Sequence, residues 1–308
     1  MAARPRLAIT LGDPRGIGPE VVAAAIADAR VRRAAEVVLV GPSGTEVTVD
    51  ESVGVWQGEE RAGGGADVAG GLVGRAIERA VALAQAGAVQ GMVTGPIDKR
   101  ALFEGGFDYA GHTEMLAALT RSNVAMMLAS DRLRVVLITT HLPLRDVPRK
   151  LTANGIVQCA RITEQGLRDW YAIAEPRIAL CALNPHAGDG GRFGDEDRIL
   201  LAPAAKAAGI AGPYSADTVF VRAIRGEFDA VLAPYHDVGM TAIKVASFGT
   251  AVNVTLGLPF PRTSPDHGTA FDIAGKGIAD PSSFIAATLE CARIAARAAP
   301  YPAPVTAA

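Results

Sequence analysis

Three of the five histidines in this 308-residue chain stand where a metal ion could be bound. His141, His186 and His236 each follow an apolar run of strand length and lie in a short polar or glycine- and proline-rich segment. Neutral imidazoles are common ligands of zinc and related divalent ions, and three of them would leave coordination positions open for substrate oxygens. The same placement also fits three unrelated loop histidines, so the residues alone leave both interpretations open.

The segments that would position these histidines alternate between strand-like and helix-like patterns. Amphipathic stretches at 19–35 and 74–87 separate short apolar runs. This alternation predicts an α/β protein with largely parallel sheets, in which ligands bind beyond the carboxyl ends of the strands. The segment 50–71 is rich in glycine and weakly patterned, which predicts a loop. The expected strands are 7–10, 37–41, 91–95, 124–128, 134–140, 177–183, 229–234 and 251–256.

The composition describes a globular protein that acts on small molecules. With 49% hydrophobic and 20% charged residues, the chain can bury the cores of two domains. A net charge of −2, with both signs mixed along the chain, offers no field that would hold nucleic acid or an anionic membrane. The start of the sequence fits neither a signal peptide nor a spanning helix. Cys159, Cys181 and Cys291 lie far apart in apolar stretches, which predicts buried thiols in a reducing, cytoplasmic compartment.

Several motifs, taken in order along the chain, resemble those of one enzyme family. They are GDPRGIGPE, VTGPIDK, GHTE, THLPL, LNPHAGDGGRFG, ADTVF, YHDVG and VNVTLGLPFPRTSPDHGTAFDIAGKG. With these motifs the chain resembles, over nearly its whole length, the 4-hydroxythreonine-4-phosphate dehydrogenases of pyridoxal phosphate biosynthesis. The segments GIGPEV and HGTAFDIAGKGIADP also resemble parts of isopropylmalate and isocitrate dehydrogenases.

This resemblance implies a fold and an assembly. The expected fold is α/β, with two α/β/α domains and a cleft between them, as in isocitrate and isopropylmalate dehydrogenases. Residues 1–120 plus 250–308 would form a cofactor-side domain, and residues 121–249 a metal-binding and dimerisation domain. The family resemblance further implies a homodimer whose active site takes residues from both subunits.

The resemblance also assigns roles to particular residues. It makes His141, His186 and His236 the metal ligands, with at least one of them supplied by the partner subunit. Arg262 and Lys244 suit a substrate with a phosphate and a carboxylate, since these need a fork-shaped donor and a point charge. The positions matched to substrate binding are His112, Thr113, Lys244, Asn253 and Arg262.

The activity implied by the resemblance is a hydride transfer followed by decarboxylation. NAD or NADP would accept the hydride from C3 of 4-phosphohydroxy-L-threonine, and loss of carbon dioxide would give 3-amino-2-oxopropyl phosphate. A divalent ion such as zinc, magnesium or cobalt would act as a Lewis acid. Val238 and Ala110 replace the glutamine and proline usual in the family. Alternatives are a 4-phospho-D-threonate or D-erythronate dehydrogenase and a non-redox enzyme similar to phosphate acyltransferases.

Several roles stay open from the sequence. Lys244, Asp237 and Asp266 are candidates for accepting the proton, and Asp237 could instead orient His236. Gly268 and Asp272 lie in the segment matched to the adenosine end of the cofactor. Asp272 could accept hydrogen bonds from ribose hydroxyls and so favour NAD, or it could cap a short helix. The segment GDPRGIGPE is not a dinucleotide fingerprint, and it predicts a glycine turn that enters a helix started by proline.

Overall fold

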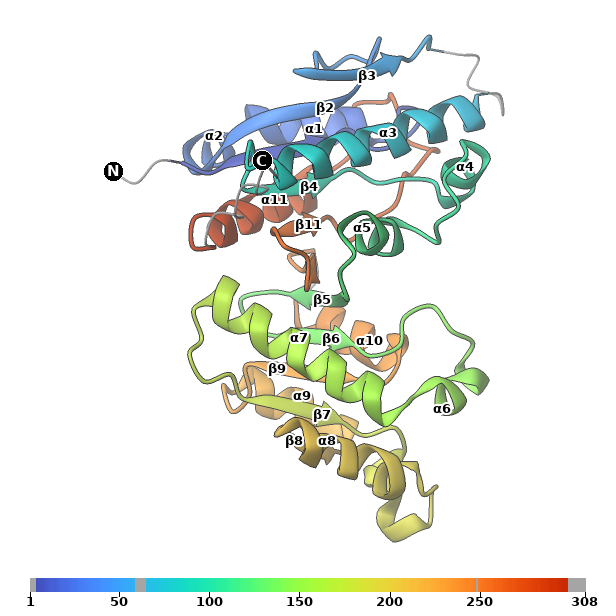
Figure 1. Ribbon diagram of the computed structural model, residues 1–308, viewed down its shortest axis with the longest axis vertical. Helices are drawn as coiled ribbons and strands as arrows, with labels where there is room; N and C mark the ends of the chain where they lie inside the picture. The colour runs from blue at the N-terminus through green and yellow to red at the C-terminus, as the bar shows by residue number, and fades with distance from the viewer. Residues whose placement is uncertain (1–3, 59–64, 248, 299–308) are drawn as a thin grey trace, which may run out of the picture. The chain divides into compact units, whose positions relative to one another are not determined.

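The computed structural model describes residues 4–58, 65–247 and 249–298. The chain divides into two compact units, one formed by Met1–Ser122 with Leu258–Ala308 and the other by Asn123–Gly257. Each unit is a sheet packed with helices, so the α/β class predicted from the sequence is confirmed (Figure 1). All eight strands expected from the apolar runs are present.

The sheet of the first unit is parallel throughout its observed pairings. Its residues point into the core on both sides, since Leu7, Ala8, Ile9 and Thr10 of the central strand are all buried. Burial on both faces is what a parallel sheet covered by helices requires. The strand order is β3 (Glu51–Val55), β2 (Glu36–Ser43), β1 (Arg6–Thr10), β4 (Gly91–Thr94) and β11 (Arg262–Ser264).

Helices cover this sheet. Helix α3 packs on β1 to β4, while α11 packs on β1, β4 and β11 beside α1 and α2. Pro19 lies in the first turn of α1, as the glycine–proline pattern predicts. The stretch 19–35 forms two helices because the side chain of Asp28 accepts a hydrogen bond from the backbone N–H of Arg30 and starts α2. The helices are α1 (Gly18–Ala27), α2 (Ala29–Ala34), α3 (Ala66–Gln85), α4 (Lys99–Glu104), α5 (His112–Thr120) and α11 (Ser282–Ala295).

The prediction of a loop over 50–71 is wrong for the described part of that segment. Strand β3 pairs with β2 at the edge of the sheet, and α3 begins at Ala66. The glycines serve packing rather than disorder. A Cβ added at Gly70 would lie 1.7 Å from the carbonyl oxygen of Ala101, so only glycine lets α3 approach α4 this closely. Residues 59–64 of the segment lie outside the described part of the chain.

The sheet of the second unit is mixed. Strand β5 runs antiparallel to both of its neighbours, and the other pairings are parallel. Buried side chains such as Val135, Leu137, Val231 and Ile243 form part of its core. The strand order is β10 (Val252–Leu256), β5 (Ala125–Ala129), β6 (Arg134–Leu137), β9 (Ala230–Ala233), β7 (Ile178–Cys181) and β8 (Ala211–Tyr214).

Helices also pack on this second sheet. Helix α7 contacts β5, β9 and β10, whereas α10 contacts β5, β6 and β9, and α9 contacts β7 and β9. The helices are α6 (Val147–Lys150), α7 (Ala153–Tyr171), α8 (Ala202–Ala208), α9 (Ala216–Ile224) and α10 (His236–Ala246), with shorter turns at η1 (Leu144–Asp146), η2 (Pro185–Gly191) and η3 (Asp197–Leu201).

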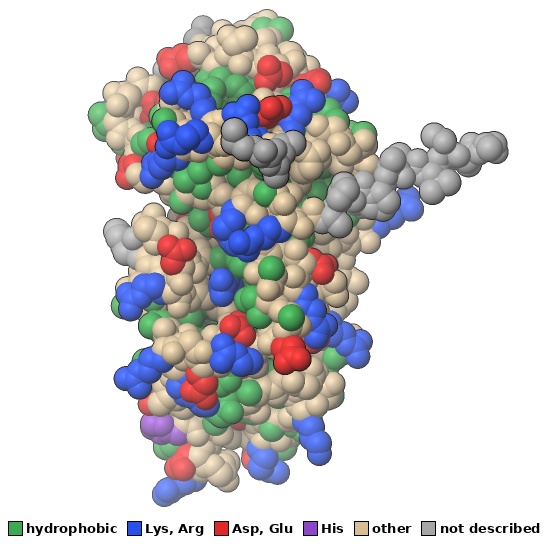
Figure 2. All heavy atoms as spheres, turned by 90° about the vertical axis from the view of Figure 1, so that its left-hand side faces the viewer, with side chains coloured by type: hydrophobic (Ala, Val, Ile, Leu, Met, Phe, Trp, Pro, Cys, Tyr) green, Lys and Arg blue, Asp and Glu red, His purple; other side chains and the backbone are tan. Residues whose placement is uncertain are grey.

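The cysteines and the surface agree with the sequence analysis. Cys159, Cys181 and Cys291 are free and buried, and burial raises the pKa of each thiol to about 12. Basic and acidic side chains are interspersed on the face drawn in Figure 2, with no broad area of one sign. Among the residues that the structure describes, no helix is both long and apolar enough to cross a bilayer.

Candidate active site

Two of the predicted metal ligands lie side by side in the second unit. Strands β6 and β9 are parallel neighbours, with Leu137 opposite Ala233, and the segments that follow them carry His141 and His236. The centroids of the two imidazole rings are 5.4 Å apart, and the ring planes are tilted by 43°. The two segments are tied together because the buried hydroxyl of Thr139 donates to the carbonyl oxygen of Pro234 at 2.7 Å.

The carboxylate of Asp237 contacts one of these rings. Its Oδ1 lies 2.7 Å from Nδ1 of His236. A carboxylate in this position favours a proton on Nδ1, which leaves the Nε2 lone pair free to bind a metal. The contact therefore favours the interpretation that Asp237 orients His236.

His186 stands apart from this pair. It lies in the tight coil Pro185–Gly191 with φ of 53°, and its ring is 6.5 Å from that of Phe193. The side chain is exposed. Within residues 4–58, 65–247 and 249–298 of this one chain, no group of three His, Cys, Asp or Glu side chains is placed to hold a metal ion. The three predicted ligands thus include one adjacent pair and one separate histidine.

Hydrogen bonds fix the shape of the coil around His186. The buried carboxylate of Asp197 accepts hydrogen bonds from the backbone N–H groups of Leu183 and Asn184, at 2.8 and 2.9 Å. The Asn184 side chain donates to Glu196 at 2.8 Å. These contacts hold the coil in a defined conformation while His186 faces solvent.

Two predicted substrate residues also belong to the second unit. Lys244 is exposed on α10, and the eight residues that separate it from His236 correspond to about 12 Å along the helix axis. Asn253 lies on β10, and its buried Oδ1 has no hydrogen-bond partner among the described residues. Such an acceptor is suited to a ligand that brings a donor.

In the first unit, two loops at the carboxyl ends of β1 and β4 interlock. The N–H of Asp13 donates to the carbonyl oxygen of Pro96 at 2.9 Å. Gly12 has φ of 76°, and a Cβ there would lie 2.3 Å from the same oxygen, so this close approach requires glycine. The fully buried Asp13 binds Arg15 in a bidentate ion pair, with contacts of 3.0 and 2.7 Å.

Beside these loops lies Arg262, the predicted anion-binding residue. Arg262 is 2% exposed, and its Nη2 donates to the hydroxyl of Thr94 at 2.5 Å. Burial lowers the pKa of the guanidinium to about 10, so the group keeps its charge at neutral pH. A buried guanidinium that keeps its charge is a donor suited to a charged substrate group.

His112 shares this environment. It is the first residue of α5, is followed by the half-buried Thr113, and its Nε2 is enclosed without a hydrogen-bond partner among the described residues. Burial lowers its pKa well below the usual 6.5, and the positive charges of Arg262 and Lys99 lower the pKa further. The sequence did not single out Lys99, although the VTGPIDK motif that contains it was recognised.

The segment predicted to bind the cofactor forms turns. No helix begins at Asp272, which is exposed, so the helix-cap interpretation of this residue is wrong. Gly268 is also exposed, and Asp266 is half-buried with its N–H donating to the Ser283 hydroxyl at 3.2 Å. The segment is anchored on the first unit because the N–H of Ile17 donates to the carbonyl oxygen of Thr269 at 2.9 Å.

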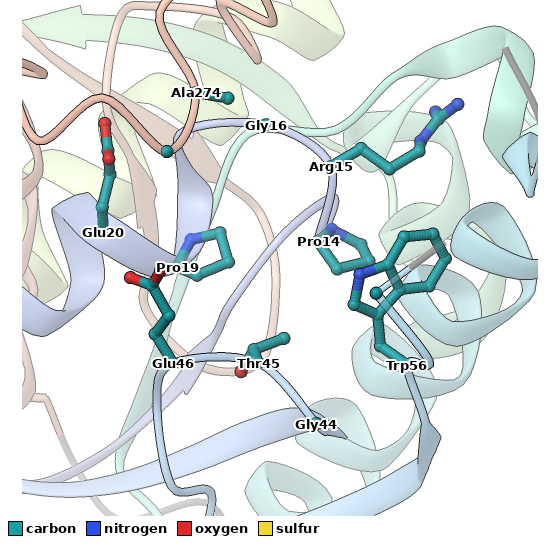
Figure 3. Close-up of a pocket in the computed structure, with 12 residues that line it drawn as sticks. Pro14, Arg15, Gly16, Pro19, Glu20, Gly44, Thr45, Glu46, Trp56 and Ala274 are labelled. Carbon is teal, nitrogen blue, oxygen red and sulfur yellow. The ribbon is translucent and has the colours of Figure 1, made fainter. Parts of the chain in front are cut away.

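A pocket of about 90 Å³, open to solvent, lies next to this segment within the first unit. Figure 3 shows the carboxylates of Glu20 and Glu46 on one side of the pocket and Pro14 and Trp56 on the other. Sequence reasoning missed this pocket because its walls come from segments far apart in the chain. The remaining lining residues are Arg15, Gly16, Pro19, Gly44, Thr45, Gly58, Ala274 and Gly275.

Comparison with known proteins decides the family. The family model described as pyridoxal phosphate biosynthetic protein PdxA matches residues 10–291, a range that includes the adjacent histidines, the buried arginine and the interlocked loops. The chain belongs to the PdxA family. The resemblance inferred from the sequence motifs is thereby confirmed.

Individual members of the PdxA family are similar over nearly the full chain. The 4-hydroxythreonine-4-phosphate dehydrogenase of Desulfosudis oleivorans is 42% identical over an alignment of 321 positions. The alignment covers 93% of this chain and 95% of that protein. The crystal structure of the enzyme of the same name from Klebsiella pneumoniae is 38% identical and has a TM-score of 0.83, covering 96% of this chain and 99% of the other.

The wider fold relationship is also present. A β-decarboxylating dehydrogenase from Thermococcus kodakarensis, 18% identical, has a TM-score of 0.52 over 92% of this chain and 81% of the other. At this identity the likeness concerns the fold alone. It confirms the expectation that this PdxA-family chain has an isocitrate dehydrogenase-like α/β fold.

Proposed function

We propose that this protein is a metal-dependent, NAD- or NADP-linked dehydrogenase that oxidises 4-phosphohydroxy-L-threonine at C3. Decarboxylation then gives 3-amino-2-oxopropyl phosphate. The observation that carries the proposal is the pairing of His141 with His236 beyond two parallel strands, in a chain of the PdxA family. Curated relatives with 42% identity are named for this activity.

The donor chemistry fits a divalent ion. Two imidazoles whose centroids are 5.4 Å apart can each direct one nitrogen to a shared ion, and zinc binds such nitrogens at about 2.0–2.1 Å. Asp237 keeps His236 in the orientation that metal binding needs. The exposed His186, held on its defined coil, would complete the site of a second copy of the chain, which supports a homodimer with a shared active site. The bound ion would supply Lewis-acid polarisation at the substrate oxygen.

The chain's own residues would bind and orient the substrate. The charged Arg262 and the neutral ring of His112 provide a buried region for an anionic end, with Thr113 next to His112 in the chain. Lys244 supplies a second positive charge, and the unsatisfied Oδ1 of Asn253 accepts a donor such as the substrate amine.

Three groups are candidates for accepting the proton. Asp237 is engaged with His236, so its orienting role is the better supported one. We infer that Lys244 or Asp266 accepts the proton. The backbone of Lys244 lies about 12 Å along α10 from that of His236, which is too far for Lys244 to lie beside an ion bound to His236. This distance favours a direct contact between Lys244 and the substrate.

The cofactor would use the segment that contains Gly268 and Asp272. Asp272 is exposed and does not cap a helix, so its carboxylate is available to accept hydrogen bonds from the ribose hydroxyls. A carboxylate there would repel a 2′-phosphate and favour NAD. The three free, buried thiols agree with action in the reducing cytoplasm.

Substrate discrimination tests this proposal. Reduction of NAD and NADP is measured with 4-phosphohydroxy-L-threonine, 4-phospho-D-threonate and 4-phospho-D-erythronate. The highest kcat/KM should belong to 4-phosphohydroxy-L-threonine with NAD. A preference for the threonate or erythronate would assign the alternative activity, for which Val238 and Ala110 would be the first residues to examine. No reduction of either cofactor with any of the three would contradict the dehydrogenase proposal.

A further inference from the structure

Lys99 and Arg100 are adjacent basic residues with different surroundings. Arg100 forms an ion pair with Glu104 one helical turn later, at 2.7 Å, on the exposed side of α4. Lys99 is also exposed, yet in the part of the chain that the structure describes it forms no ion pair. Its position is fixed by the first turn of α4, where the side chain of Asp98 accepts a hydrogen bond from the N–H of Ala101 at 2.7 Å.

The aliphatic stem of Lys99 lies against the entrance to α5. A Cβ added at Gly111, the residue before His112, would lie 3.4 Å from Cε of Lys99. The same point would lie 3.6 Å from Oε2 of Glu114, but Glu114 and Lys99 form no ion pair. Lys99 is therefore close to the backbone that positions His112.

Lys99 and Arg262 bring two positive charges to the imidazole of His112. Both charges lower the pKa of that imidazole, in addition to the effect of burial. Two positive charges beside a buried imidazole whose Nε2 has no hydrogen-bond partner among the described residues suit an anionic group that can contact all three. A carboxylate carries one negative charge, whereas a phosphate monoester carries about −1.5 to −2 at pH 7 and can balance both.

We propose that Lys99 is a further substrate-binding residue, which together with His112 and Arg262 holds the phosphate group of the substrate. The inference rests on the proposed function, and it assigns the phosphate group to the part of the site formed by these three residues. Arg262 offers a planar fork from a buried position, and Lys99 offers a mobile point charge from the exposed side. The imidazole of His112 provides its buried Nε2, which has no hydrogen-bond partner among the described residues.

The test uses inorganic phosphate as a probe, so that it does not depend on turnover. The imidazole signals of the full-length protein are followed by NMR, and the signal of His112 is assigned with His112→Gln. In the wild type, phosphate should shift the His112 signal and raise its pKa. Lys99→Gln should weaken phosphate binding by roughly tenfold, as expected when a charge-assisted hydrogen bond is lost. Arg100→Gln is the matched control and should bind phosphate as the wild type does.

A second readout separates binding of the phosphate from other roles. Lys99→Gln should raise the KM for 4-phosphohydroxy-L-threonine by roughly tenfold while the KM for NAD stays unchanged. Lys99→Arg should restore most of the loss because it keeps the positive charge. The loss of kcat/KM in Lys99→Gln should be smaller with unphosphorylated 4-hydroxy-L-threonine than with the phosphorylated substrate.

The outcomes distinguish this inference from the proposed function. Equal phosphate binding by Lys99→Gln and Arg100→Gln, or no phosphate effect on His112 in the wild type, would overturn the role of Lys99 while leaving turnover to be judged separately. Conversely, Lys99-dependent phosphate binding in a protein that reduces no cofactor would support the phosphate site and refute the dehydrogenase. Lys99 would be assigned to a structural contact with Glu114 under two conditions. Lys99→Arg would fail to restore phosphate binding, and Glu114→Gln would weaken phosphate binding as much as Lys99→Gln does.

Discussion

His141 and His236 meet with their ring centroids 5.4 Å apart although 95 residues separate them in the chain. The parallel pairing of β6 with β9 brings them together, since each histidine follows the carboxyl end of one of these strands. Asp237 holds the second ring through Nδ1. The relationship is the structural basis for the proposed metal site.

The metal content of histidine variants should follow this pairing. Purified protein is expected to contain about one divalent ion per subunit, and His236→Ala and His186→Ala should each remove both the ion and the activity. The fold should persist because neither histidine is part of a buried core cluster. Metal analysis and circular dichroism of the same samples check this. A metal-free His186→Ala protein with full activity would refute the three-histidine site.

Asp237→Asn should have a smaller effect than loss of a ligand. The amide cannot stabilise the Nδ1 proton as a carboxylate does, so metal affinity should fall by about 10- to 100-fold while the protein still binds the ion at saturation. Metal titration with a chelating dye measures the affinity. If Asp237→Asn kept its metal affinity but lost turnover even at saturating metal, Asp237 would be the proton acceptor instead.

Mixed dimers should reveal whether subunits share a site. His141→Ala and His186→Ala proteins are each expected to be inactive, and subunit exchange should restore part of the activity because one of the two sites in a mixed dimer would regain all three ligands. Exchange is verified with differently tagged subunits. Activity that stays absent in confirmed mixed dimers would count against the sharing of ligands between chains.

Arg262 should act on the substrate rather than on the cofactor. Arg262→Ala removes a buried charge that typically contributes ~1.5–3 kcal/mol when paired, so kcat/KM for the phosphorylated substrate should fall by roughly one to two powers of ten. Arg262→Lys keeps the charge but loses the fork and should lie in between. Steady-state kinetics and the melting temperature are measured together. Weakened NAD binding with unaltered substrate kinetics would contradict the assignment.

The sequence predicted the framework of the fold but not all of its contacts. The eight strands expected from apolar runs are all present, and Pro19 marks the start of α1. These features could be predicted because their signals are local in the sequence. The loop expected over 50–71 was wrong because glycine is ambiguous. It is common in loops, but Gly70 lies in α3 for a close contact with Ala101, which is 31 residues away.

The candidate site was likewise predicted only in part from the sequence. Motif matches identified His141 and His236, and the strand pairing then accounts for their contact. Lys99 was missed because a single lysine at the start of a helix has no distinguishing pattern. Its relation to His112 exists only after α4 and α5 have been placed next to each other.

The close packing of α3 and α4 gives a stability prediction with an internal control. Gly70→Ala should destabilise the protein by about 1–3 kcal/mol, because its Cβ would overlap the Ala101 carbonyl and force the helices apart. Gly71→Ala, in the same helix, meets nothing closer than 3.4 Å and should be neutral or stabilising by up to about 1 kcal/mol. Denaturant unfolding of both variants measures the difference. Equal stabilities would show that the helices are not packed this closely.

We infer that this protein is a metal-dependent dehydrogenase of a phosphorylated hydroxy amino acid. This activity is tested most directly by following NADH formation and carbon dioxide release with 4-phosphohydroxy-L-threonine, before metal removal with a chelator, after it, and after metal is restored. Equal amounts of the two products are expected, with loss of both without metal and recovery of both when a divalent ion is returned. Undiminished formation of both products by the metal-free protein, or no product under any of the three conditions, would contradict the inference.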